Sequence, residues 1–78
     1  MSVDLELEFR RLRDELPNPP RRRLIREAAG VTQDAVAEDV GVDRATISRW
    51  ESGDREPRDC YLAKYSAVLA KMAAAAAA

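Results

Sequence analysis

Residues 33–52 read QDAVAEDVGVDRATISRWES and contain the strongest fold signal in the chain. Two helix-forming segments, 33–40 and 44–51, flank a short connection that contains Gly41. A connection this short does not let two helices lie antiparallel. The helices must therefore cross at a steep angle, as they do in a helix-turn-helix.

The same stretch supplies the side chains that a steep crossing requires. Ala37 is small enough to lie at the crossing, where a larger side chain would force the helices apart. Thr32 and Asp43 are candidate N-caps of the two helices, and Gly41 suits the left-handed conformation that ends the first one. The buried face is expected to consist of Val36, Val40, Val42, Ile47 and Trp50. Trp50 is therefore interpreted as a core residue and not as a platform for a stacked base.

Two further helices are predicted on the N-terminal side. Apolar side chains spaced 4, 3 and 4 residues apart indicate a helix over residues 3–16, with a stripe formed by Leu5, Phe9, Leu12 and Leu16. Pro17 ends this helix, and Pro19 or Pro20 occupies the first turn of the next one, which ends at Gly30.

A last helix is predicted from about Asp59, after Ser52 and Gly53 have ended the segment 44–51. Its apolar positions recur at helical spacing and are Leu62, Tyr65, Leu69 and Met72. The fold class is therefore all-α, a compact bundle of about five short helices that contains a helix-turn-helix. We divide the chain into an extra helix with a Pro-rich link (1–18), a helix-turn-helix domain (19–72) and a poly-Ala tail (73–78), to which no function is assigned.

Composition excludes several classes of function. A chain of 78 residues is one small domain at most, with no room for a large substrate pocket. The absence of His excludes His-based catalysis and His-ligated zinc, and the single Cys excludes a disulfide and a Cys-cluster metal site. No enzyme, metal or cofactor is therefore predicted, and Cys60 is expected to be a buried or half-buried small side chain. With no membrane span or signal peptide in the pattern, we expect a soluble, cytoplasmic protein.

Charge is strongly segregated although the net charge is only −1. Residues 10–26 hold seven Arg against two acids, residues 27–43 hold five acids and no base, and residues 44–58 hold four Arg against three acids. Arg is the side chain suited to bidentate contacts with phosphate or guanine. Taken alone, such blocks are more often solvated helix faces, so charge does not decide the function.

The motifs together resemble the helix-turn-helix domain of the XRE family, the Cro and phage-repressor group. The landmarks lie within residues 21–69 and are Arg26, Gly30-Val31-Thr32-Gln33, Val36-Ala37, Gly41-Val42, Ile47-Ser48-Arg49, Glu51-x-Gly53-x-x-x-Pro57, Leu62, Tyr65 and Leu69. The resemblance implies a lambda-repressor-like fold in which residues 44–51 are the recognition helix. The chain departs from the family at Arg22, where an apolar residue is usual, and in its helix over residues 3–16.

A recognition helix directs its N-terminal half towards base edges in the major groove. The side chains opposite Ile47 and Trp50 are therefore the candidate base contacts, and they are Arg44, Ala45, Ser48 and Arg49. The candidate phosphate contacts are Gln33, Thr46, Ser52, Arg55 and Arg58. By resemblance, Arg26 and Glu51 form a structural ion pair, and Gln33 is the family residue that holds a phosphate at a helix N-terminus.

Other charged residues have less defined roles. The cluster Arg21, Arg22 and Arg23 either contacts phosphate or is simply solvated. The acids of the segment 33–40 are expected to face away from DNA, and they are Asp34, Glu38 and Asp39. Arg44 and Arg49 have an alternative role, an ion pair with a neighbouring acid.

The predicted function is sequence-specific binding of double-stranded DNA by a transcriptional regulator, expected to be a repressor of bacterial or phage origin. One recognition helix covers one half-site, so a homodimer on an inverted repeat is expected. Candidate dimer surfaces are the apolar stripe of helix 3–16, which alternatively packs on the chain's own core, and a surplus of apolar groups on the last helix at Tyr61, Val68 and Met72. The alternative function is a protein-interaction module, such as an antitoxin that binds a partner protein and regulates its own promoter.

Overall fold

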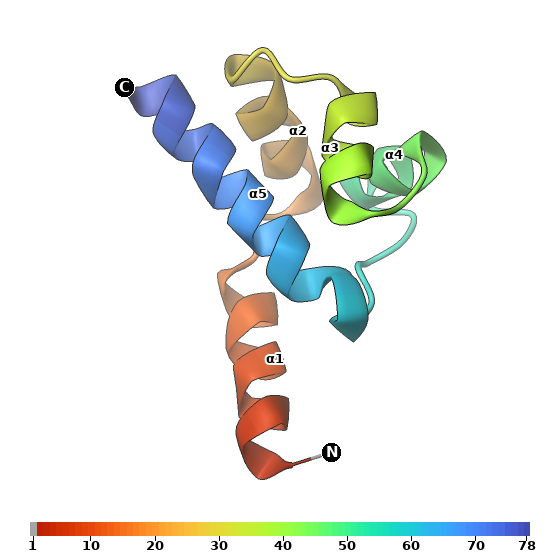
Figure 1. Cartoon of the computed structure of the whole chain (residues 1–78), viewed down its shortest axis with the longest axis vertical. Helices are drawn as coiled ribbons and strands as arrows, with labels where there is room; N and C mark the ends of the chain where they lie inside the picture. Colours follow the sequence, from red (N-terminus) through yellow and green to blue (C-terminus); the bar gives the residue numbers. More distant parts are fainter. Residues whose placement is uncertain (1) are drawn as a thin grey trace.

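The computed structural model describes residues 2–78, and these residues form five α-helices without a strand (Figure 1). The helices are α1 (Val3–Glu15), α2 (Pro19–Ala28), α3 (Gln33–Val40), α4 (Arg44–Ser52) and α5 (Asp59–Ala77). The predicted all-α bundle is confirmed, and each helix lies where the sequence pattern places it.

Local sequence signals fix the ends of the helices. Four of the helices begin at a side-chain cap that accepts a hydrogen bond from a backbone N–H three residues later, and these caps are Ser2, Asn18, Thr32 and Asp43. Gly41 ends α3 with φ of +89°, and Gly53 ends α4 with φ of +87°. Both values lie in the left-handed region that favours glycine, so a glycine sets the C-terminal end of α3 and of α4.

The core lies between α2, α3, α4 and α5. Figure 1 shows α5 crossing in front of α2, with α3 and α4 grouped on one side of it. The buried apolar core consists of Val36, Ala37, Val40, Ile47, Trp50, Leu62, Tyr65, Leu69 and Met72. Val42, which the sequence predicts to share the buried face, is only half-buried against this cluster, because it lies in the turn between α3 and α4. The rings of Trp50 and Tyr65 pack with their centroids 4.7 Å apart. Because this contact joins α4 to α5, it fixes α4 against the rest of the bundle.

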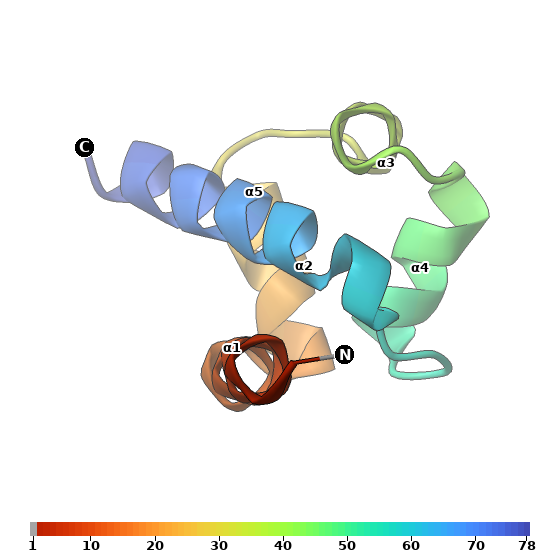
Figure 2. The same ribbon diagram turned by 60° about the horizontal axis from the view of Figure 1, so that its bottom comes forward.

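Helix α1 packs on α5 and projects beyond the bundle, away from the C-terminal turns of α5 (Figures 1 and 2). Leu16 packs against the core, and Leu12 lines a small apolar cavity with Ile25 and Leu69. Leu5 is 43% exposed, and Phe9 is half-buried. The C-terminal half of the stripe therefore packs on the chain's own core, whereas the N-terminal half does not.

Two expectations about the last helix are wrong. Met72 is buried in the core, and Tyr61 packs on Trp50 with ring centroids 6.0 Å apart, so neither is a spare apolar group for dimerisation. Val68 is half-buried against the same cluster. Cys60 is exposed, not buried, because it lies in the first turn of α5 on the side away from the core.

Candidate nucleic-acid interface

The outer face of α4 is exposed and polar over its whole length. Ile47 and Trp50 point into the core and anchor the helix. The side chains on the other side are solvent-exposed, and they are Arg44, Ala45, Ser48 and Arg49. The structure therefore places all four candidate base contacts on an accessible surface of one helix.

A buried ion pair holds α4 to α2. Arg26 donates from Nε to Glu51 Oε2 at 2.6 Å and from Nη2 to Oε1 at 3.0 Å, and its Nη1 donates to the backbone oxygen of Val31 at 2.9 Å. Both side chains are largely removed from solvent. The hydrogen bond with Glu51 raises the pKa of Arg26 above its ordinary value, in spite of its partial burial. The pair that the family resemblance implies is thus present, and it fixes the angle between α2 and α4.

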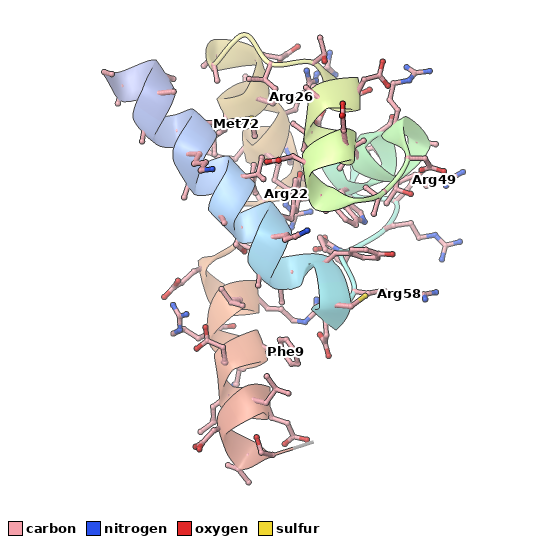
Figure 3. All side chains as sticks on the ribbon, viewed as in Figure 1. Phe9, Arg22, Arg26, Arg49, Arg58 and Met72 are labelled. Carbon is pink, nitrogen blue, oxygen red and sulfur yellow. The ribbon has the colours of Figure 1, made fainter. Side chains whose placement is uncertain are left out.

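Gln33 is connected to the same pair. Its Nε2 donates to Glu51 Oε1 at 3.1 Å, so the first residue of α3 is oriented by the recognition-helix carboxylate. Figure 3 shows Arg26 among the elements of the bundle, whereas Arg49 and Arg58 reach outward from it.

One edge of α4 faces the start of α3. Arg44 lies 3.7 Å from Asp34, measured from Nε to Oδ1, and both side chains are well exposed. Asp34, which is expected to face away from DNA, therefore lies beside the candidate base-contact residue Arg44, because the first turn of α3 lies against the first turn of α4. Glu38 and Asp39 are exposed on α3 and line a hollow that it forms with α5.

The other edge of α4 borders a basic hollow of about 460 Å³. Arg49 from α4, with Arg55 and Arg58 from the following loop, contributes to its wall, and Trp50 and Tyr61 lie behind them. Figure 3 shows the side chains of Arg49 and Arg58 on the same side of the molecule. Asp43 and Glu56 also line the hollow, so its wall holds three arginines against two acids beside the exposed face of α4.

Asp43 and Thr46 shape the first turn of α4. Asp43 Oδ1 accepts hydrogen bonds from Thr46 Oγ1 at 2.6 Å and from its backbone N–H at 2.8 Å. The hydroxyl bond, and then the backbone bond, lower the pKa of Asp43 below its ordinary value. The Thr46 hydroxyl therefore already donates its proton to Asp43, and it must give up this hydrogen bond before it can donate to a phosphate.

The family of this chain is found by comparison with known protein families. The family model described as Helix-turn-helix matches residues 23–71. The chain belongs to the XRE-type helix-turn-helix family. None of the curated proteins and none of the solved structures matches it.

Membership in the helix-turn-helix family makes α3 and α4 the characteristic helix pair and indicates a DNA-binding transcription regulator. The family is a regulatory one and typically non-enzymatic. Within residues 2–78, no helix combines the length and the apolar character needed to cross a membrane.

Arg22 is the residue at which this helix-turn-helix domain differs from expectation. It is neither solvated nor available to a phosphate, because it is only 3% exposed. Its guanidinium donates to the backbone oxygens of Pro17 and Trp50 and pairs with Glu56. The role of Glu56 was not predicted either. The burial of Arg22, though not its partners, could have been predicted from the spacing. Arg22 lies on the same face of α2 as Ile25, Arg26 and Ala29, and this face turns towards the core.

Proposed function

We propose that the chain is a sequence-specific regulator of transcription that inserts α4 into the major groove of double-stranded DNA. The observation that carries this proposal is the exposed polar face of α4, anchored from behind by Ile47, Trp50 and the buried Arg26–Glu51 pair. A helix held this rigidly presents its side chains in a fixed register, which base reading requires.

The base contacts follow from the exposed face. Arg44 and Arg49 are the candidates for bidentate hydrogen bonds to guanine O6 and N7, each contributing roughly 1–3 kcal/mol of discrimination. Ser48 lies between them, and Ala45 is placed to contact a thymine methyl group. Arg44 must exchange its weak contact with Asp34 for the base, and this exchange costs little because both side chains are exposed.

The phosphate contacts lie on the two sides of the groove. Gln33 lies at the N-terminus of α3, where the helix dipole favours an anion, and Glu51 orients its amide. Arg55 and Arg58 flank the other side of α4 and are proposed to contact the opposite strand. Thr46 and Ser52 are proposed to join them by exchanging the hydroxyl hydrogen bonds that they donate to Asp43 and to the Arg49 backbone oxygen. Contacts of this type position the domain without reading sequence.

The proposal assigns residues 19–72 to the DNA-binding domain and residues 1–18 to an additional helix with its link. We infer a repressor of bacterial or phage origin that works in the cytoplasm as a homodimer on an inverted repeat, with half-sites about 34 Å apart. The exposed Leu5 and the half-buried Phe9 are the apolar groups of the α1 stripe that remain for a second copy.

A binding selection from a random pool of duplexes tests the proposal, with the full chain and its Arg44→Ala/Arg49→Ala variant at about 0.15 M salt. We expect the unmodified chain to enrich an inverted repeat and the variant to enrich none. A pool that stays unenriched with the unmodified chain would refute sequence reading and would favour the protein-interaction alternative.

A further inference from the structure

Arg22 joins three separate parts of the chain. Its Nε donates to the Pro17 backbone oxygen at 2.7 Å, and its Nη1 donates to the Trp50 backbone oxygen at 2.9 Å. Its two terminal nitrogens also bind the Glu56 carboxylate, at 3.4 Å for Nη1–Oε1 and 2.9 Å for Nη2–Oε2. The link before α2, the C-terminal turn of α4 and the loop after α4 therefore meet at one buried guanidinium.

The loop between α4 and α5 depends on few other attachments. Its residues 54–58 lie outside any helix. The Arg55 N–H donates to the Arg49 backbone oxygen at 3.3 Å, and the side chain of Pro57 is fully buried. The Glu56 carboxylate is the only side-chain group of the loop, within residues 2–78, that a salt bridge fixes to the bundle. Arg55 and Arg58 flank Glu56 and Pro57 on either side.

We propose that the Arg22–Glu56 pair is a positioning device for DNA binding, which holds the loop so that Arg55 and Arg58 meet the phosphate backbone. This inference rests on the proposed function and adds two positioning residues to it. Arg22 is buried and cannot touch DNA, so it acts through the loop. Glu56 is half-exposed within the basic hollow and acts by fixing the backbone that carries both arginines.

Removal of the Glu56 carboxylate changes DNA affinity in opposite directions under the two explanations, so the direction of the change tests the inference. A carboxylate beside the phosphate backbone repels DNA, so its removal should strengthen binding if charge were all that mattered. Asp54 is an exposed acid in the same loop, and no hydrogen bond or salt bridge of its carboxylate is found within residues 2–78. Asp54→Ala therefore removes the same charge without removing the attachment to Arg22.

The experiment measures binding of the full chain to a duplex of random sequence between about 50 and about 200 mM salt. We expect Asp54→Ala to bind at least as tightly as the unmodified chain, with the same salt dependence. Glu56→Ala should bind more weakly, and the slope of log K against log salt should fall in magnitude by up to about 2, since two phosphate contacts are lost.

A second variant covers the case in which Glu56→Ala fails to fold with Arg22 left unpaired. Arg22→Leu/Glu56→Ala has the net charge of the unmodified chain and leaves no unpaired buried charge at this site, and it should show the same weakened binding and reduced slope. The inference would be overturned if Glu56→Ala bound as tightly and with the same salt dependence as Asp54→Ala. It would also be overturned if the double variant bound as tightly and with the same salt dependence as the unmodified chain. Binding by the unmodified chain that does not depend on salt would instead refute the proposed function on which it rests.

Discussion

At the scale of single residues, buried charge organises the domain. Arg26 and Glu51 connect α2 to α4, and Arg22 connects α2 to the end of α4 and to the following loop. The Arg26–Glu51 pair could be predicted because the family resemblance implies it. Arg22 could not be assigned, because its acceptors are two backbone oxygens and a carboxylate 34 residues away, and no local pattern marks them.

Arg26→Ala should be strongly destabilising. The variant leaves the Glu51 carboxylate buried without its countercharge, and the loss of one partner of a buried pair typically costs about 3–5 kcal/mol. Thermal and urea denaturation measure this cost, with the exposed Arg23→Ala as control. A variant with the stability of the unmodified chain would show that the pair does not hold α4.

Tyr65→Phe tests the burial of a hydroxyl. Tyr65 is 1% exposed, its hydroxyl has no hydrogen-bond partner within residues 2–78, and burial raises its pKa to about 12. Because removal of an unsatisfied group releases its desolvation cost, we expect the variant to be at least as stable as the unmodified chain at pH 7.

The alkaline response of the two proteins should differ. The folded chain keeps Tyr65 protonated up to about pH 12, whereas the unfolded chain ionises it near pH 10. Stability from this group is thus complete below pH 10 and is lost as the pH rises towards 12. Between pH 9 and pH 11, urea denaturation should show the unmodified chain losing about 1 kcal/mol more than Tyr65→Phe. Equal losses would contradict the burial of this hydroxyl.

At the scale of helices, the sequence predicts best those features that depend on interactions between residues close together in the chain. The caps Thr32 and Asp43, the prolines before α2 and the glycine that ends α3 all act within a few residues, so their pattern predicts the helix ends. The approach of Asp34 to Arg44 was missed because it depends on how the first turns of two helices meet. The division of the α1 stripe was missed for a similar reason, since periodicity identifies a face but not how far a neighbour covers it.

Gly41→Ala tests the turn between α3 and α4. Gly41 has φ of +89°, and a Cβ there would meet no atom within 4 Å, so the cost of the substitution is conformational and not steric. We expect a loss of about 1 kcal/mol in the free energy of unfolding for Gly41→Ala, and a smaller loss for Gly41→Asn, which tolerates the left-handed region. Urea denaturation measures both, and an Ala variant as stable as the unmodified chain would contradict the assigned turn.

At the scale of the whole molecule, segregated charge reconciles a net charge of −1 with DNA binding. Arginines gather on the outer face of α4 and in the adjacent hollow, while Glu38 and Asp39 lie along the hollow between α3 and α5. A duplex approaching the hollow between α3 and α5 meets Glu38 and Asp39, so docking on that side is disfavoured relative to the α4 face.

An NMR titration of the full chain with a short duplex shows which face of the molecule DNA occupies. At about 0.15 M salt, we predict that the amide signals of Gln33, of the first turns of α4 and of residues 54–58 shift on addition of DNA. Those of α1, Glu38 and Asp39 should stay in place. Shifts confined to α1, Glu38 and Asp39, with α4 and Gln33 unchanged, would contradict docking on the α4 face.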